Sequence, residues 1–274
     1  MPADVTPRDR DRPPDGFSVS LVIPMYNEEG SIEHAIACAR GALERCANDW
    51  EIIVVDDAST DRCGEIVRGM ASDDPRIRLF RHERNRRLGA TIRTGFAQAS
   101  KDLVLYMDAD LPFVPHEAFE RGIRALTVSR ADMIAAYRFD RTTEGLKRTM
   151  YSYVYNFLIG ALFGWPHRDV NFSFKLIRRD ALRTIELKAE GSLIDAELLV
   201  KARNLGFVIQ QIGLDYFPRS RGQSTLSSPT VIVQLLRELV ALYPEMRNPR
   251  RVASGQDRTT LEVPSSRESA HRHG

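Results

Sequence analysis

The chain has 274 residues, of which 43% are hydrophobic and 28% are charged, as is usual for a globular protein. This composition excludes a disordered or fibrous protein, and the formal net charge of +2 argues against a dedicated nucleic-acid binder. The three cysteines form no paired metal-binding motif, which is typical of a reduced protein whose cysteines are small packing residues.

The two ends of the chain are polar. Residues 1–16 are rich in Pro, Asp and Arg and lack the apolar core of a signal peptide, so we expect a disordered leader. Residues 248–274 have the same character and predict a disordered tail. The folded part is then a domain over residues 17–226, followed by an amphipathic helix over residues 227–247.

Strands and helices alternate along the predicted domain. Short apolar runs predict buried strands at residues 19–23, 51–55, 77–80 and 103–107. Helical spacing predicts helices at residues 31–46, 60–70 and 88–99, with Asp61 in the first turn of the second. This order predicts an α/β fold, a single Rossmann-like domain in which a mostly parallel central sheet is flanked by helices.

A run rich in arginine, from Arg76 to Arg93, contains one acid, Glu83. Such a run is either a solvated surface segment or a patch that faces phosphates or an anionic membrane surface.

Two later segments predict apolar helices. The first, residues 150–165, would reach only about 24 Å at ~1.5 Å per residue, short of a ~30 Å hydrocarbon core, so we do not expect it to span a membrane. It is apolar on nearly every side, which is typical of a core or dimer helix or of a helix lying in a lipid interface. In the second, residues 230–243, one face is expected to carry Ile232, Leu235, Leu236 and Leu239, and the opposite side Gln234, Arg237, Glu238 and Ala241.

Polar residues follow three of the predicted strands: residues 24–29, 56–61 and 108–110. Ligands of such sheets bind beyond the carboxyl ends of the strands, so these turns should share one crevice. Asp108 and Asp110 offer the oxygen ligands that Mg²⁺ or Mn²⁺ shares with substrate phosphates. Each acid alone is more often a helix cap or a solvated loop residue. Their convergence is what predicts a metal site.

Three segments carry a family resemblance: VSLVIPMYNE (19–28), EIIVVDDASTD (51–61) and DLVLYMDADL (102–111). In this order they resemble the inverting family 2 glycosyltransferases, and more narrowly the dolichol-phosphate mannosyltransferase and polyprenyl-phosphate glycosyltransferase branch. The resemblance covers roughly residues 18–226 and implies the GT-A fold.

The resemblance implies a role for each residue at the strand ends. Pro24, Tyr26 and Glu28 correspond to the motif that cradles the nucleoside. Asp57, with Asp56 beside it, corresponds to the aspartate on the base. Asp108 and Asp110 correspond to the motif that holds the metal bridging the donor diphosphate.

Further along the chain, the resemblance implies residues near the phosphates and the acceptor. Arg138 and Arg148 correspond to family arginines there, Asp169 to an aspartate facing the reaction centre, and Asp195 and Glu197 to a later acidic pair. Arg219, Gly222 and Ser224 correspond to an Arg-x-x-Gly-x-Ser-Lys segment. This chain departs from the family pattern at Thr225, where the family often has lysine. A second departure lies in the turn that leads into a helix and that contains Asn85, Leu88, Gly89 and Gly95. There, Arg86 and Arg87 replace a glycine-containing stretch.

The implied activity is metal-dependent, inverting transfer of a sugar from a GDP- or UDP-sugar. The first choice of acceptor is a polyprenyl or dolichyl phosphate, and the alternative is a soluble hydroxyl, for which Asp169 or Asp195 is the candidate general base. A non-catalytic nucleotide-binding scaffold and a nucleotidyltransferase are further alternatives. The latter would carry a Gly-rich, Lys-bearing loop where this chain has residues 24–29. We expect a cytoplasmic protein that is either free or peripheral on the cytoplasmic face of a membrane. A homodimer or a membrane partner protein is a further possibility for its assembly.

Overall fold

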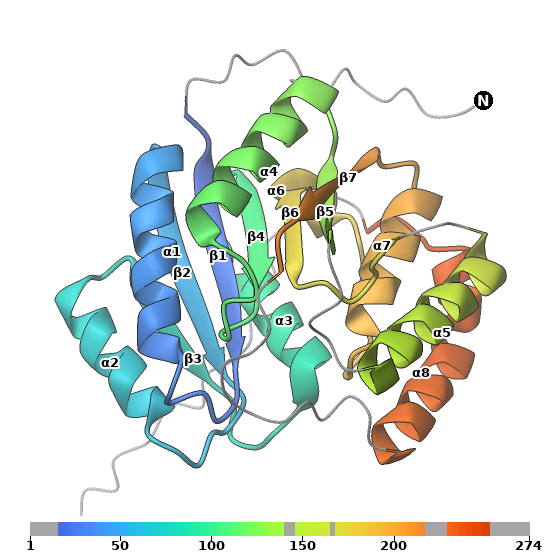
Figure 1. Cartoon of the computed structure of the whole chain (residues 1–274), viewed down its shortest axis with the longest axis horizontal. Coiled ribbons are helices and arrows are strands. Elements are labelled where there is room, and N and C mark those ends of the chain that lie inside the picture. Colours follow the sequence, from blue (N-terminus) through green and yellow to red (C-terminus); the bar gives the residue numbers. More distant parts are fainter. Residues whose placement is uncertain (1–15, 140–145, 165–167, 217–228, 253–274) are drawn as a thin grey trace, which may run out of the picture.

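The computed structural model describes residues 16–139, 146–164, 168–216 and 229–252 (Figure 1). A seven-stranded sheet has the order β3-β2-β1-β4-β6-β5-β7. The strands are β1 (Ser18–Met25), β2 (Asp49–Asp56), β3 (Ile77–Arg81), β4 (Leu103–Met107), β5 (Met133–Arg138), β6 (Phe174–Arg178) and β7 (Ile209–Leu214). The helices are α1 (Ile32–Cys46), α2 (Cys63–Asp73), α3 (Arg87–Gln98), α4 (Pro115–Ser129), α5 (Leu146–Phe163), α6 (Arg179–Arg183), α7 (Ile194–Asn204) and α8 (Pro229–Arg247).

The first four strands pair in parallel, as the alternation of elements predicts. Successive side chains of a strand point to opposite faces of the sheet. Leu21 and Ile23 therefore join one apolar core, whereas Val22 between them joins the other. In Figure 1, α1, α2 and α4 cover the first face and α3 and α7 the second. The predicted α/β fold with a mostly parallel sheet is confirmed.

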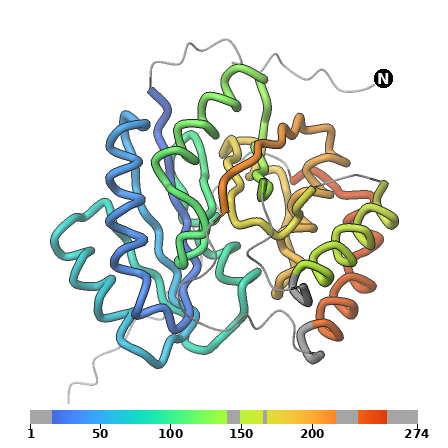
Figure 2. The backbone as a smooth tube through the Cα atoms, viewed as in Figure 1, coloured from blue at the N-terminus to red at the C-terminus, as the bar shows by residue number. Residues whose placement is uncertain are grey.

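The second half of the sheet contains a reversed strand. β6 runs antiparallel to both β4 and β5, and β7 pairs in parallel with β5. Helices α5 and α8 lie side by side at this end of the molecule (Figures 1 and 2), and the rings of Phe163 and Tyr243 are 5.4 Å apart between centroids. Ile159 of α5 and Leu239 and Met246 of α8 belong to the second core.

Helix α2 begins three residues later than predicted, at Cys63, so Asp61 precedes the helix. The backbone N–H of Ser59 donates to Asp56 Oδ1 at 2.8 Å, and that of Cys63 donates to Asp61 Oδ1 at 3.1 Å. Such short-range bonds from side chains compete with helical hydrogen bonding and favour a turn. Asp61, expected in the first turn of the helix, instead forms part of the turn that precedes it.

The prediction of the faces of α8 was wrong at three positions. Leu239 is buried as expected, but Leu236 is exposed, and Gln234 and Glu238 are half-buried. The carboxylate of Glu238 accepts the backbone N–H of Gly191 at 3.0 Å. Burial raises the pKa of Glu238, whereas the bond from Gly191 lowers it. The loop before α7 provides a backbone donor that the helical pattern of α8 does not encode.

The expected leader lies almost entirely outside the described residues, as does the tail beyond residue 252. The start of the predicted tail, however, contacts the domain. Arg251 forms a bridge with Ile185, and the N–H of Val252 donates to the carbonyl of Thr184 at 3.0 Å.

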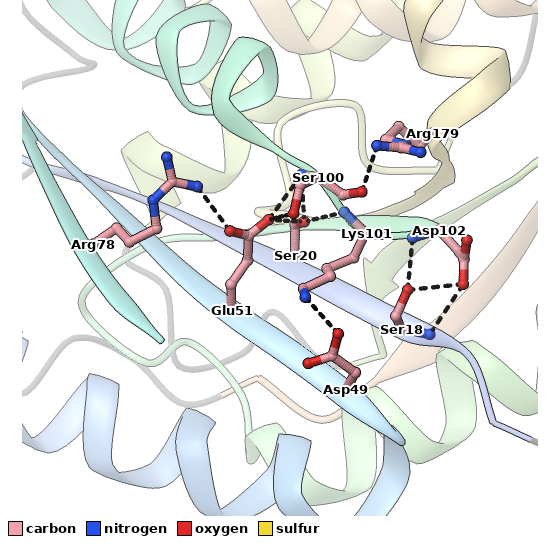
Figure 3. Close-up of polar contacts among 9 residues, drawn as sticks. All are labelled: Ser18, Ser20, Asp49, Glu51, Arg78, Ser100, Lys101, Asp102 and Arg179. Atoms are coloured by element: carbon pink, nitrogen blue, oxygen red, sulfur yellow. Dashed lines mark hydrogen bonds and ion pairs between the residues drawn. The ribbon is translucent and has the colours of Figure 1, made fainter. Parts of the chain in front are cut away.

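The amino ends of β1, β2 and β4 are joined by a polar network (Figure 3). Glu51 accepts hydrogen bonds from Ser20 Oγ at 2.7 Å, from the N–H and Oγ of Ser100 at 2.8 Å each, and from Arg78 at 2.8 Å. Burial raises the pKa of Glu51, but these hydrogen bonds outweigh burial and lower it. Because ligands bind at the opposite ends of the strands, this network serves stability.

We expect Glu51→Gln to lower the free energy of unfolding by about 1–3 kcal/mol at neutral pH, because bonds to an ionised buried group are lost. The folded-state pKa is depressed, so the contribution of Glu51 is present above its unfolded pKa and is lost as the pH falls through its folded pKa. Urea denaturation of both proteins from pH 7 to pH 3 checks this, and the difference should shrink on acidification. Asp49→Asn, at an exposed carboxylate at the same end of the sheet, is the control. A pH-independent difference would contradict the prediction.

Candidate active site

The loops after β1 and β2 are bound to each other. The N–H of Asn27 donates to Ser59 Oγ at 3.0 Å, and the N–H of Thr60 donates to Asn27 Oδ1 at 2.8 Å. Asn27 and Ala58 have left-handed backbones, with φ of 55° and 63°. β1 lies between β2 and β4, so the carboxyl ends of three neighbouring strands meet at one edge of the sheet.

The residues expected at the nucleoside lie on β1 and just after it. Pro24 is buried within the strand, opposite Val55 of β2. The side chain of Tyr26 is 48% exposed, so its ring is open to stacking. Glu28 helps to start α1, because its carboxylate accepts Ser31 Oγ at 2.8 Å.

Asp57 organises the loop between β3 and α3. Its Oδ1 lies 2.7 Å from His82 Nδ1 and accepts the N–H of Arg86 at 2.8 Å, and its Oδ2 accepts the N–H of Arg87 at 2.7 Å. His82 Nε2 in turn lies 2.9 Å from Thr94 Oγ1 on α3. Asp57, which the resemblance implies on the base, is buried, and its carboxylate holds the loop between β3 and α3. Sequence analysis missed His82, whose position directly after β3 was the available signal.

Asp56 lies on the other side of the β2 end from Asp57. Its Oδ2 is 3.2 Å from Arg81 Nη1, and its Oδ1 accepts the N–H of Ser59. These contacts join the end of β2 to the end of β3 and to the loop that follows β2.

The departure from the family pattern at Arg87 has a structural counterpart. Arg87 adopts a φ of 70°, a left-handed conformation that costs a non-glycine residue free energy. Its bond to Asp57 compensates for part of that cost. Two residues on, a Cβ at Gly89 would lie 2.3 Å from the carbonyl oxygen of Ala189, so the close approach of this backbone requires glycine.

This loop borders a hollow of about 660 Å³. Its lining consists of Arg81, His82, Glu83, Arg84, Asn85, Arg86, Arg87 and Glu190. The arginine-rich run therefore divides into two parts. Arg76 pairs with Asp74 and Arg78 with Glu51, both at 2.8 Å, whereas Arg84, Arg86 and Arg87 are exposed at the hollow.

Asp108 and Asp110 directly follow β4 and are both half-buried. Asp108 Oδ1 accepts the hydroxyl of Tyr106 at 3.0 Å. Burial, followed by the charge of Asp108, raises the pKa of Tyr106, so this hydroxyl is a donor at neutral pH. Over the described residues, no group of three or more His, Cys, Asp and Glu side chains is arranged to hold a metal ion. Two carboxylates nonetheless fit Mg²⁺ or Mn²⁺, because such ions are commonly held by one or two carboxylates together with substrate phosphates.

Arg138, at the end of β5, forms a two-point ion pair with Asp169. Its Nε lies 2.6 Å from Asp169 Oδ2, and its Nη2 lies 3.0 Å from Oδ1. The side chains are 7% and 0% exposed. The guanidinium also lies over the rings of Phe172 and Tyr216, at 5.7 and 5.1 Å from their centroids. Two segments that are distant in the sequence thus place an arginine and an aspartate together, a pairing that sequence analysis did not predict.

Asp195, in the first turn of α7, faces Lys175 of β6 and forms a buried ion pair with it. Burial raises the pKa of Asp195 to about 6, against the lowering effect of Lys175, and the charges of Asp108 and Asp169 raise it further. The neighbouring acid Glu197 is engaged elsewhere, with Lys201 at 2.6 Å and the N–H of Ala189 at 2.7 Å. Sequence analysis did not single out Lys175, although a lysine within an apolar strand was the available signal.

The remaining predicted site residues cannot be placed. Arg148 lies in α5, but its side chain is outside the described part of the structure. Arg219, Gly222, Ser224 and Thr225 all fall in the undescribed range 217–228.

Comparisons with known proteins identify relatives of this chain. The chain is 27% identical over 232 residues to the dolichol-phosphate mannosyltransferase of Pyrococcus furiosus, an alignment covering 82% of this chain and 64% of that protein. It is 34% identical over 164 residues to the undecaprenyl-phosphate 4-deoxy-4-formamido-L-arabinose transferase of Pectobacterium carotovorum, covering 59% of this chain and 49% of that protein. The chain thus spans less than two thirds of the length of these curated relatives.

Among solved structures, the glucosyl-3-phosphoglycerate synthase of Mycobacterium tuberculosis in complex with Mn²⁺ and UDP-glucose aligns with a TM-score of 0.64. The identity is 21%, and the alignment covers 84% of this chain and 79% of the other, which establishes a shared fold. Residues 20–186 match the family model Glycosyl transferase family 2. Because this match covers more than half of the chain, the protein belongs to glycosyl transferase family 2, with the GT-A fold that its motifs predict.

Proposed function

We propose that this protein transfers a sugar, with inversion, from a GDP- or UDP-sugar to a polyprenyl or dolichyl phosphate. In this reaction, the acceptor oxygen forms a bond to the anomeric carbon. The bond from that carbon to the diphosphate breaks, and the nucleoside diphosphate leaves with the electron pair. The observation that carries the proposal is the meeting of the β1, β2 and β4 ends, where the charges of Asp108, just after β4, and of Asp169 both act on the buried Asp195 of the Lys175–Asp195 pair.

Asp108 and Asp110 are the residues that would hold Mg²⁺ or Mn²⁺. The ion would supply positive charge that neutralises the departing diphosphate. The hydroxyl of Tyr106 orients Asp108 by donating to its Oδ1. Tyr26, exposed after β1, provides a ring for stacking on the base. Arg84, Arg86 and Arg87, on the loop held by Asp57, give this side of the crevice a positive charge that suits an anionic donor.

The ion pair of Asp169 favours a phosphate acceptor over a hydroxyl. Asp169 has both oxygens engaged by Arg138. A carboxylate held by a cation is a weaker base. Asp195, whose pKa burial raises to about 6 against the effect of Lys175, is the candidate base for the hydroxyl alternative. A hydroxyl acceptor needs a base to remove its proton, whereas a phosphate oxygen is already anionic at neutral pH. Arg138, Arg148 and Arg219 are the arginines we assign to the phosphates of donor and acceptor.

The test is a nucleoside-diphosphate release assay over a panel of UDP- and GDP-sugars with Mn²⁺ or Mg²⁺, with and without a short polyprenyl phosphate. We expect release with one donor, dependent on the metal and increased by the lipid. Release that is increased by a soluble alcohol and not by the lipid would support the hydroxyl alternative. Binding of nucleotide without release would support the scaffold alternative.

The lipid acceptor also accounts for the apolar surface of α5 and α8. Exposed apolar side chains recur at helical spacing on α5, at Met150, Val154 and Phe157, and on α8, at Val233, Leu236 and Val240. Among the helices that the structure describes, none is both long enough and apolar enough to cross a bilayer. We assign these exposed side chains to peripheral contact with a membrane surface that presents the lipid.

Liposome flotation tests this assignment. The double variant Val154→Asp/Phe157→Asp should lower the fraction bound to vesicles containing anionic lipid by about tenfold, because charge is introduced where apolar side chains would enter the interface. Val128→Asp is a matched control, since Val128 and Phe157 are both 78% exposed and Val128 lies at the far end of α4. Equal flotation of the two variants, or no flotation of the unmodified protein, would contradict peripheral attachment through α5.

A further inference from the structure

Lys175 lies among the charged groups around the proposed reaction centre, and the function described above uses it only as the partner of Asp195. It is completely buried in β6, which is unusual for a lysine. An ammonium has three hydrogens to donate. Here they are directed at the carbonyl of Val170 at 2.9 Å, the carbonyl of Phe172 at 2.5 Å, and the carboxylate of Asp195.

Two of these acceptors belong to the segment that carries Asp169. Val170 directly follows Asp169, and the ring of Phe172 lies beneath the guanidinium of Arg138. The same segment is held from α5, where Asn156 Oδ1 accepts the N–H of Val170 at 3.0 Å. Lys175 therefore binds the backbone on both sides of Asn171 and fixes where the Arg138–Asp169 pair can lie.

Lys175 also contacts the strand that carries the proposed metal ligands. In the pairing of β6 with β4, Lys175 lies opposite Tyr106, and its ammonium is 5.7 Å from the centroid of the Tyr106 ring. Tyr106 donates to Asp108. A single buried cation thus connects α7, the Asp169 segment and the residue that orients Asp108.

We infer that Lys175 is a positioning residue for sugar transfer: it holds the Arg138–Asp169 pair in register with Asp108. This inference rests on the proposed function. It goes beyond that function because it assigns the activity a residue that touches neither donor nor acceptor. The alternative is that Lys175 only balances the buried charge of Asp195 and thereby stabilises the fold.

The chain contains a matched control for this alternative. Lys201 on α7 is also buried and is paired with a buried acid, Glu197, at 2.6 Å. It donates to the carbonyl of Glu186 at 2.7 Å and makes no described contact with residues 168–173. Lys175→Met and Lys201→Met therefore each remove a buried ammonium and leave a buried carboxylate.

The experiment compares these two variants with the unmodified protein at a temperature at which each is folded by circular dichroism. We expect Lys175→Met to lower kcat by roughly 100-fold, as displacement of a reacting group by about 1 Å does. The donor KM should change less than about threefold, since a positioning residue acts on the chemical step. Lys201→Met should retain kcat within about threefold. Equal kcat values for the two folded variants would overturn the inference.

Two further measurements keep the test decisive. If Lys175→Met does not fold, the double variant Lys175→Met/Asp195→Asn replaces it, because the double variant leaves no unpaired buried charge. Its kcat is compared with that of Asp195→Asn, and equal values overturn the inference. Hydrogen–deuterium exchange of residues 168–174 requires no substrate. Exchange there should rise in Lys175→Met and not in Lys201→Met, and equal exchange overturns the positioning claim. Absence of turnover by the unmodified protein would count against the proposed function alone.

Discussion

Asp110→Asn is expected to lower kcat for nucleoside-diphosphate release by about 100- to 1,000-fold, the usual cost of losing a group that stabilises developing charge. Asp108 and Asp110 are two carboxylates just after β4, and among the described residues no group of three or more His, Cys, Asp and Glu side chains could hold a metal ion. An amide in place of one carboxylate would leave the ion with a weaker and less negative site. The Mn²⁺ concentration at half-maximal rate should therefore also rise.

The control for this prediction is Asp102→Asn, because Asp102 precedes β4 at the other end of the same strand. Its carboxylate accepts Ser18 Oγ at 2.8 Å within the network of Figure 3 and lies on the side of the sheet away from the site. Asp102→Asn should therefore keep the Mn²⁺ dependence unchanged. Near-normal turnover of Asp110→Asn, with an unchanged Mn²⁺ titration, would show that the metal assignment is wrong.

Arg138→Met is expected to have the largest effect on stability, a loss of about 3–5 kcal/mol in the free energy of unfolding, because it leaves a buried carboxylate without its cation. Asp169 is fully buried and has both oxygens engaged by Arg138. Arg138→Met/Asp169→Asn should recover much of this loss, since no unpaired charge remains, but it should not recover turnover.

Urea denaturation followed by circular dichroism measures the effect. Arg76→Met is the control because Arg76 contacts Asp74 through the same two-point geometry, at 2.9 and 2.8 Å, but its side chain is 47% exposed, against 7% for Arg138. Solvent screens that pair, so its loss should be much smaller. Equal losses for the two variants would mean that burial does not determine the strength of the Arg138–Asp169 pair.

Much of the first half of the fold follows from local patterns. The strand predicted over residues 103–107 has the observed bounds, and those at 19–23, 51–55 and 77–80 lie within observed strands. A strand that is buried on both faces of a parallel sheet is apolar along its whole length, so its own sequence is enough to predict it. The positions of Tyr26, Asp57, Asp108 and Asp110 at strand ends follow from the same pattern.

Other features depend on contacts between segments far apart in the sequence. The reversal of β6, the Arg138–Asp169 pair and the Lys175–Asp195 pair join β5, β6, the segment before β6, and α7. The sequence pattern of one segment does not predict which distant carbonyl or carboxylate a buried cation will contact. The same reason applies to Glu238, whose partner Gly191 lies 47 residues away.

Asp57 illustrates both what the local sequence pattern predicts and what only contacts between distant segments decide. Its place after β2 is local and was predictable from the run of apolar residues that ends there. Its partners, His82 and the backbone of Arg86 and Arg87, come from the next loop, and they make it an organiser of the crevice wall. Local hydrophobic spacing is enough to bring acids to the edge of a sheet, because burial is decided residue by residue. The partner of each acid depends on how the packed elements are oriented, and that orientation exists only once the two cores have formed.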